Sequence, residues 1–297
     1  MRIDPYSLEL FISVVEEGSI ARAASRSHIA PSALSRRIAD LEAAIGVALL
    51  IRSPAGVQLT EAGQHAYASA RSIHGQLEGM AREVRSMSGQ IAGVVRLHAN
   101  ASAIVGFLPE RLTLFKTRYP LVEIALTERI SDEVIRACLD DRADVGISAS
   151  TKTHAGLDTW HFADDPLMVV LPPAHELAQA QRLSFAEVAR FPLVALQAGG
   201  SLDQTLKEHA DAARVPLNVT VTVNSFDAQC RMVEAGLGIG IVPTSAASAF
   251  AGSRNFVRVP LAESWGSGRC LHVHAPRKST RLKAVQALID TLVEFEG

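Results

Sequence analysis

Apolar residues recur at every third or fourth position through the first 45 residues, and this spacing predicts helices. The first stripe comprises Leu8, Phe11, Ile12 and Val15. Gly18 is expected to end that helix, and Ser19 is a good N-cap for a short second helix over about residues 19–27. The "HIAP" segment at 28–31 predicts a tight turn, since Pro31 suits the first position of a third helix.

The third helix has an apolar stripe at Leu34, Ile38, Leu41 and Ile45. At about 100° per residue, Ser32 and Arg36 point away from this stripe, and Ser35 and Arg37 lie on its flanks. Small residues at Ala39 and Ala43 complete the outer face. Such a face can approach another surface closely.

A hairpin and a long helix are expected next. Two short apolar runs flank "SPAG" at 53–56, Arg52 lies at the hairpin entrance, and Thr60 is a candidate N-cap. A heptad seam then follows at Ala66, Ala70, Ile73, Leu77, Met80, Val84 and Met87. An intermolecular coiled coil fits this long, narrow stripe, so Ala70, Ile73, Leu77, Met80 and Val84 are predicted dimerisation residues. The alternative is a helix packed on its own domain.

From about residue 90 the pattern alternates between strand and helix, which predicts α/β structure with parallel pairing. Strands are expected at 94–99, 122–127 and 143–148, and in a second set at 166–173, 192–197, 218–223, 238–243, 256–261 and 269–275. A helix is expected through Phe107, Leu108, Leu112 and Phe115, with Ser131 capping the next helix and a last helix at about 281–295. These elements indicate two α/β lobes.

Composition adds few further constraints. The 297 residues, 48% of them hydrophobic, suggest about two domains. The chain has 29 basic and 31 acidic side chains, yet residues 21–38 hold four arginines and no acid. The N-terminus does not resemble a signal peptide, and no uncharged apolar run approaches the ~20 residues of a membrane span. We therefore expect a cytoplasmic protein without a membrane partner.

Catalytic and metal-binding patterns are missing from the sequence. Cys138, Cys230 and Cys270 lie far apart and are expected to be buried apolar residues, and His272 and His274 alternate on a predicted strand as one face of a sheet. "GLGIGI" at 236–241 follows a helix and enters a strand, the reverse of a dinucleotide-binding motif. We expect neither an enzyme nor a metal site.

The N-terminal order of helix, helix, tight turn, helix and hairpin is that of a winged helix-turn-helix, whose third helix enters the major groove of DNA. Ser32, Ser35 and Arg36 are then the predicted base contacts. Arg22, Arg26, Arg37 and Arg52 are the predicted phosphate contacts. A helical bundle with a solvated basic face is the alternative.

Two turns in the α/β region are candidates for binding a small molecule. Asn100-Ala101-Ser102 and Gly199-Gly200-Ser201 each follow a strand and begin a helix, where free N–H groups and the helix dipole favour an anion. Each alone is equally consistent with a plain N-cap, but one in each lobe suggests an anionic or polar metabolite. Glu128, Arg129, Ser225 and Phe226 are weaker candidates for the wall.

These motifs together resemble the LysR-type transcriptional regulators. Shared elements are "EEGS", "RAA", "SALSRRI", "LLIR" and "LTEAG" in the N-terminal part and "RYPLVEIAL", "ADVGIS" and "GLGIGIVP" further on, so the resemblance covers essentially the whole chain. It implies a winged helix-turn-helix at 1–60, a linker and dimerisation helix at 61–89, and an effector-binding region at 90–297 similar to type 2 periplasmic binding proteins. Lobe 1 would comprise about 90–163 plus 269–297, and lobe 2 about 164–268.

The resemblance also implies partners. These are double-stranded DNA with an interrupted palindrome, a small-molecule effector in place of any cofactor, a homodimer that assembles into a tetramer, and RNA polymerase as a further partner. A rival hypothesis is an α/β enzyme or solute-binding protein with a helical appendage.

The sequence departs from the family at the start of the third helix. The family often has Ser or Thr where this chain has Ala30, and a glutamine where it has Pro31-Ser32, so Ser32 must serve as the base contact. Peroxide-sensing relatives carry a reactive cysteine in the stretch that matches "GGSLDQTL", and this chain has none there. This argues against thiol sensing.

Overall fold

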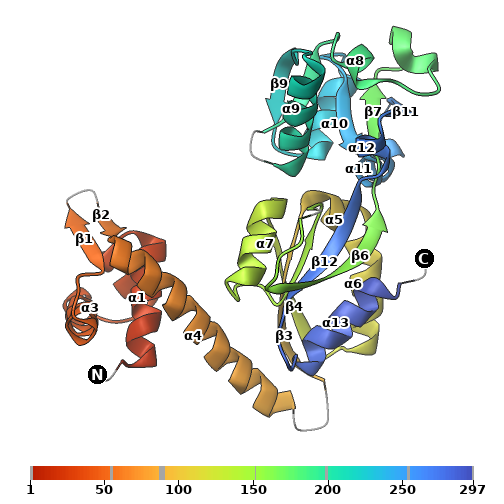
Figure 1. Ribbon diagram of the computed structural model, residues 1–297. Helices are drawn as coiled ribbons and strands as arrows, with labels where there is room; N and C mark the ends of the chain where they lie inside the picture. The colour runs from red at the N-terminus through yellow and green to blue at the C-terminus, as the bar shows by residue number, and fades with distance from the viewer. Residues whose placement is uncertain are drawn as a thin grey trace. The chain divides into compact units, whose positions relative to one another are not determined.

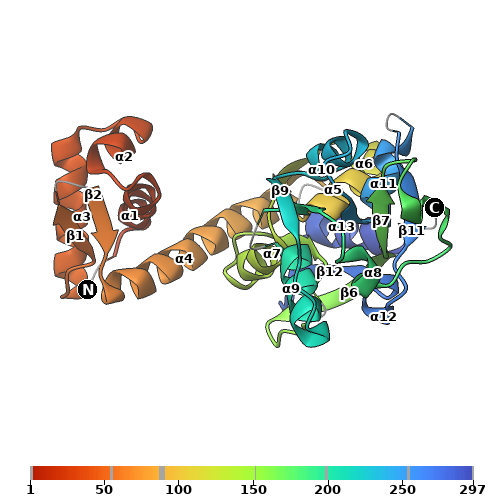
Figure 2. The same ribbon diagram turned by 90° about the horizontal axis from the view of Figure 1, so that it is seen from above.

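The computed structural model describes residues 3–53, 56–86, 91–150, 152–197, 200–252 and 255–295, except the side chains of residues 78, 81–86 and 251. It divides into two compact units, residues 1–90 with 140–142 and residues 91–139 with 143–297. The first unit is mainly helical and the second is α/β (Figures 1 and 2).

The first unit has the predicted order of elements: α1 (Pro5–Glu17), α2 (Ile20–Arg26), α3 (Pro31–Ile45), β1 (Leu50–Ser53), β2 (Gly56–Leu59) and α4 (Glu61–Ser86). The predicted boundary residues are confirmed. Gly18 ends α1 with a φ of 59°, and the Ser19 hydroxyl accepts from the N–H of Arg22 as the cap of α2. Thr60 Oγ1 accepts from the N–H of Gly63 at 2.9 Å and so caps α4.

The turn between α2 and α3 is a Schellman motif with a histidine in the left-handed position. The N–H of His28 donates to Ser25 O at 3.2 Å, and the N–H of Ile29 donates to Ala24 O at 3.0 Å. His28 has a φ of 54°, where glycine is usual. These two hydrogen bonds end α2 and turn the chain into α3.

The core of the first unit lies where α1, α2 and α3 meet, with Phe11, Ala23, Leu34 and Ile38 fully buried. The start of α4 packs on the same core, and Ala70 is only 1% exposed. The prediction that Ala70 contributes to a dimer is therefore wrong, because this side chain is covered by its own domain.

Beyond Ala70 the heptad seam is open to solvent. Ile73, Leu77 and Met80 are 41%, 39% and 59% exposed. The side chains of Val84 and Met87 lie outside the described part of the chain. The intramolecular alternative thus holds for the first turns of α4, and the apolar side chains that follow are available to a second helix.

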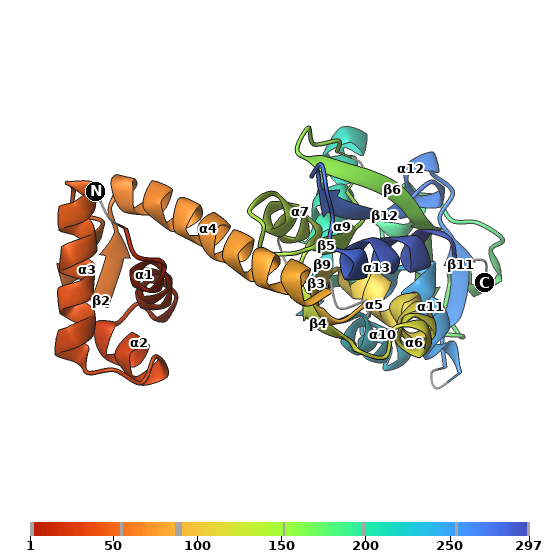
Figure 3. The same cartoon turned by 90° about the horizontal axis from the view of Figure 1, so that it is seen from below.

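The first lobe of the second unit is a five-stranded sheet of order β4-β3-β5-β12-β6. Its strands are β3 (Gly93–Ala99), β4 (Val122–Glu128), β5 (Val145–Ser148), β6 (Leu157–Asp164) and β12 (Cys270–Pro276). Helices α5 (Ala101–Gly106), α6 (Leu108–Arg118) and α13 (Lys283–Val293) cover one face, and α7 (Ser131–Leu139) covers the other (Figure 3). The expected parallel pairing holds for β3, β4 and β5, but β12 runs antiparallel to β5 and to β6, a strand not predicted.

The second lobe contains an antiparallel sheet, β10-β7-β11, and a parallel pair, β8-β9. Its strands are β7 (Leu167–Leu171), β8 (Leu193–Leu196), β9 (Val219–Val223), β10 (Gly240–Pro243) and β11 (Val257–Pro260). Hydrogen bonds of Ile239 with Pro192 and Val194, both 2.9 Å long, join the pair to the larger sheet. Its helices are α8 (Phe185–Val188), α9 (Ser201–Ala213), α10 (Phe226–Glu234), α11 (Thr244–Ala251) and α12 (Ser264–Ser267), with a 3-10 turn at Glu176–Gln179.

The chain crosses between the lobes twice, from β6 to β7 and from α12 to β12. The N–H of Asp165 on the first crossing donates to Arg269 O on the second at 2.9 Å. Helix α5 of one lobe also packs directly on α11 of the other, where a Cβ at Gly106 would collide with Ser245. The lobes therefore meet at the crossings and at this helix pair.

Two helix starts in the first lobe differ from the prediction. The helix expected through Phe107, Leu108, Leu112 and Phe115 is α6, with Phe107 as its N-cap. A short separate helix, α5, precedes it, because Pro109 lies in the first turn of α6 and favours a new helix start. Ser131 does not cap α7 but lies in its first turn, where Val134 N–H bonds to Ile130 O at 3.0 Å. Its hydroxyl instead accepts from Ala149 N–H at 3.2 Å and donates to Ser201 Oγ at 3.3 Å.

Candidate functional site

The exposed face of α3 presents the predicted base contacts. Leu34, Ile38 and Leu41 are buried, which turns Ser32 and Arg36 outward as the periodicity required. Ala30 stands at the N-cap without a side-chain hydrogen bond, so the first-turn N–H groups of α3 have no cap. An uncapped helix N-terminus is a favourable place for a DNA phosphate.

Arg22 and Arg26 are exposed but paired with acids at the end of α1. Arg22 donates to the backbone oxygen of Glu17, and its Nε lies 3.8 Å from the Glu17 carboxylate. Arg26 lies 3.0 Å from the Glu17 carboxylate and 3.5 Å from that of Glu16. A phosphate would compete with these acids for both arginines.

Arg37 and Arg52 are also held by neighbours. Arg37 donates to Asp4 at 3.1 Å, and its guanidinium lies 4.9 Å from the centre of the Tyr6 ring. Arg52 on the wing donates to Ser35 Oγ at 2.9 Å and so contacts α3 directly.

Arg36 differs from these four arginines. Within the described chain it makes no hydrogen bond or ion pair, and it is exposed on α3. Among the described residues, Arg36 is therefore the predicted DNA-contacting arginine whose guanidinium can bind DNA without first leaving an intramolecular partner.

A cavity of about 400 Å³ lies between the two lobes of the second unit. Its lining residues are Asn100, Ala101, Ser102, Glu128, Arg129, Ile130, Ser131, Glu133, Leu196, Gln197, Gly200, Ser201, Leu202, Asp203, Asn224, Phe226 and Arg269. The structure thus brings the two predicted helix starts together across one space.

Seven of the eight predicted effector contacts line this cavity: Asn100, Ala101, Ser102, Glu128, Gly200, Ser201 and Phe226. Ser225 does not line it; its hydroxyl accepts from the N–H of Ala228 at 3.2 Å as the cap of α10. Asn100 lines the cavity, but its side chain accepts from Ala103 N–H at 3.0 Å and so caps α5. Gly199 lies outside the described residues.

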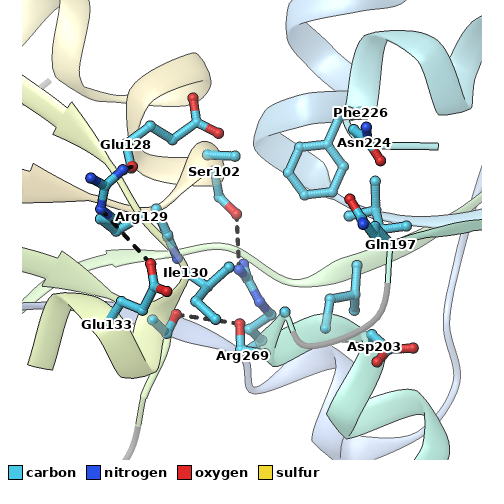
Figure 4. Close-up of a pocket in the computed structure, with 17 residues that line it drawn as sticks. Ser102, Glu128, Arg129, Ile130, Glu133, Gln197, Asp203, Asn224, Phe226 and Arg269 are labelled. Carbon is cyan, nitrogen blue, oxygen red and sulfur yellow. Dashed lines mark hydrogen bonds and ion pairs between the residues drawn. The ribbon is translucent and has the colours of Figure 1, made fainter. Parts of the chain in front are cut away.

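Arg269 is the main residue that the sequence did not reveal. Its guanidinium donates to Ser102 Oγ at 2.9 Å (Figure 4). It also donates to the carboxylate of Asp165 at 2.6 Å. It lies 167 positions from Ser102 and belongs to no local motif, so only the fold places it in the cavity.

The cavity carries charges of both signs. Glu128, Glu133 and Asp203 line it, against Arg129 and Arg269. Arg129 lies 3.8 Å from Glu133, and Lys207 lies 2.9 Å from Asp203. In Figure 4 the Glu128 carboxylate lies above Ser102, and Asp203 lies to the lower right, on the other side of Arg269.

The cysteines and His274 belong to the structure of the lobes and not to the cavity. Cys138 and Cys230 are buried and Cys270 is half-buried. His274 is fully buried between Ser148 Oγ and Thr159 Oγ1, at 3.0 and 3.1 Å. Desolvation, with smaller contributions from the charges of His272 and His154, lowers the pKa of His274 to about 4.

No group of three or more His, Cys, Asp or Glu in the described ranges has the geometry of a metal site. Among the helices that the structure describes, none is both long and apolar enough to span a membrane.

These features define a class: a winged helix-turn-helix protein with a two-lobed α/β domain that encloses a small-molecule cavity. Comparison with known proteins agrees. Residues 6–64 match the family described as bacterial regulatory helix-turn-helix protein, lysR family, and residues 88–296 match the LysR substrate binding domain. The chain belongs to the LysR family of DNA-binding transcriptional regulators.

Named relatives and solved structures support this assignment. The probable HTH-type transcriptional regulator LrrA of Synechococcus elongatus is 31% identical over 81% of each chain, and the HTH-type transcriptional regulator TtuA of Agrobacterium vitis is 29% identical over 97% of this chain and 98% of its own. Both are transcriptional regulators rather than enzymes. The crystal structure of CbnR, a LysR family transcriptional regulator, shares the fold with a TM-score of 0.71 at 21% identity over 98% of both chains. CbnR has also been solved full-length with its target DNA, and that structure matches with a TM-score of 0.70 at 22% identity over 98% of this chain and 99% of its own.

Proposed function

We propose that this protein is a sequence-specific, cytoplasmic DNA-binding regulator that acts as a homodimer or as a tetramer of two dimers, controlled by a small anionic metabolite bound between its lobes. The observation that supports DNA recognition most strongly is the outer face of α3. It presents Ser32 and Arg36, which has no partner among the described residues, beside a first turn without a side-chain cap, with Arg52 of the wing in contact with Ser35. Arginine can bond both O6 and N7 of guanine, and serine can donate or accept.

The exposed apolar side chains of α4 support the proposed dimer. Ile73, Leu77 and Met80 are large apolar side chains left exposed at heptad spacing, and a second copy of the helix would cover them. A two-fold dimer presents two α3 helices, so the operator should be an interrupted palindrome with half-site centres about one helical turn apart.

The interlobe cavity supports control of DNA binding by a small ligand. Hydroxyl groups of Ser102, Ser131 and Ser201 from both lobes converge there with the guanidinium of Arg269. A ligand that binds one arrangement of the lobes more tightly than another would shift their equilibrium, and with it the geometry of the paired DNA-binding domains.

In vitro selection from a random duplex pool tests DNA recognition with the full-length protein. We expect an enriched interrupted palindrome, bound more tightly than random duplex at every salt concentration, with both affinities falling as salt rises. As a control, the variant Arg118→Ala should enrich the same palindrome. Arg118 is an exposed arginine on α6 without a partner among the described residues. Failure of the intact protein to enrich any sequence would refute the proposal.

A further inference from the structure

The guanidinium of Arg269 lies where both lobes meet the cavity. Nη1 donates to the backbone oxygen of Asp165 at 3.0 Å and to its carboxylate at 2.6 Å, and Nη2 donates to Ser102 Oγ at 2.9 Å. The Arg269 side chain is 11% exposed and that of Asp165 is fully buried. One side chain thus joins the crossing between the lobes to the first turn of α5.

Asp165 in turn is fixed from the second lobe. Its Oδ1 accepts from the N–H of Ser245 at 3.0 Å, and its Oδ2 accepts from the Ser245 hydroxyl at 3.1 Å. Ser245 belongs to α11, the helix that packs on α5. These contacts hold the guanidinium of Arg269 in one orientation before any ligand arrives, so little order is lost when the ligand binds.

Arg269 still has donors to offer. A guanidinium carries five N–H groups, and the contacts above use the two on Nη1 and one on Nη2. In the part of the chain that the structure describes, Nε–H and the second Nη2–H have no protein acceptor. Arg269 also lines a second cavity of about 300 Å³, bounded by Thr205 and Trp265, so open space adjoins it on two sides.

The surrounding charge limits what these donors can receive. Asp165 already balances the charge of Arg269, and Glu133 lies near Arg129. Lys207 balances Asp203, which leaves Glu128 as a lining acid with no ion pair among the described residues. A second negative charge on a ligand would therefore meet repulsion from Glu128. Leu196 and Phe226 provide an apolar wall for the rest of the ligand.

We infer that Arg269 is the specificity-determining residue of this cavity, that it receives a single carboxylate group through its remaining N–H donors, and that the cavity selects monocarboxylates over dicarboxylates and phosphate. The inference rests on the proposed function and specifies its ligand class. Asp165 acts as the positioning residue, since it touches Arg269 and not the cavity. A guanidinium can form two parallel, charge-assisted hydrogen bonds with a carboxylate.

Tryptophan fluorescence of the full-length protein tests this inference, because the chain has two tryptophans and Trp265 lines the second cavity beside Arg269. In a Trp160→Phe background, Trp265 is the sole reporter. The probes are sodium propionate and phenylacetate, their amides propionamide and phenylacetamide, and the multiply charged succinate and phosphate. We expect at least one monocarboxylate to bind about tenfold or more tightly than its amide, and more tightly than succinate or phosphate.

The Arg269→Gln variant should reduce that carboxylate-to-amide ratio to about one, whereas Arg118→Gln should leave it unchanged. A merely structural role would weaken both probes equally and keep the ratio. Because a lone buried Asp165 would destabilise the fold, the double variant Asp165→Asn/Arg269→Gln removes both charges together and should lose the ratio as well.

Two results would overturn the inference, and they differ in meaning. If the wild type prefers a carboxylate and both variants keep that preference, Arg269 is not the receptor, although the proposed anionic effector stands. If the wild type binds no carboxylate in preference to its amide, the anionic part of the proposed function fails and the inference fails with it.

Discussion

Arg36→Ala should weaken binding to the selected operator far more than binding to random DNA. Arg36 is exposed on α3 and makes no ion pair within the described chain, so its loss removes no intramolecular contact and should leave stability unchanged. A bidentate contact to guanine contributes about 1–3 kcal/mol. A dimer presents the residue at two well-separated half-sites, so the losses should add to roughly 2–6 kcal/mol.

Fluorescence anisotropy with the selected duplex and with a random duplex measures this difference, with thermal unfolding as the check on stability. Arg37→Ala is an informative comparison, because Arg37 is bound to Asp4 and Tyr6. Its removal should lower stability only slightly, because the pair is exposed, and should weaken both duplexes alike. An equal loss on both duplexes for Arg36→Ala would show that Arg36 contacts only phosphate and would refute the assignment.

Three further predictions concern assembly and stability. Sedimentation velocity should show that Leu77→Asp dissociates the dimer, whereas Gln76→Asp, at an exposed position beside the heptad seam, should leave the dimer intact. An unchanged mass for Leu77→Asp would show that the seam joins no second chain. The pKa of His274 is about 4 in the folded protein and 6.5 in the unfolded chain, so the unfolded chain binds the extra proton as the pH falls. The free energy of unfolding should therefore fall by about 2 kcal/mol from pH 7 to pH 5 on account of His274. His274→Gln should flatten that dependence in thermal unfolding, and an unaltered pH profile would contradict the burial argument. The φ of His28 is 54°, a left-handed conformation that glycine adopts more easily than a β-branched residue. His28→Gly should therefore raise the free energy of unfolding of the first unit by about 1 kcal/mol, and His28→Val should lower it. A stabilising valine would contradict the turn assignment.

Local signals were sufficient to predict the DNA-binding part of the chain. Gly18, Ser19 and Pro31 each act within a few residues on the helix that they end or begin, and they placed all three helices correctly. The apolar stripe of α3 then fixed which side chains face outward. Ala70 was assigned wrongly because a heptad pattern does not say whether its own domain or a second chain covers a given turn.

The α/β part was predicted less completely because its key contacts are distant in sequence. The alternating pattern gave most strands, but the antiparallel pairing of β12 with β5 and β6 depends on which edges meet in space. The helix starts at Asn100 and Gly200 were found from local turn chemistry. Arg269 and Asp165 were not, because they meet only where the chain crosses between the lobes.

The most direct test measures DNA binding and ligand binding together. The full-length protein is titrated onto its selected duplex with and without a saturating monocarboxylate that binds in the Trp265 assay, with the matching amide as control. We expect the carboxylate, and not the amide, to change the dissociation constant or the footprint on the selected duplex, and we expect Arg269→Gln to abolish the change. Sequence-specific binding that is identical with and without the bound carboxylate would contradict this expectation.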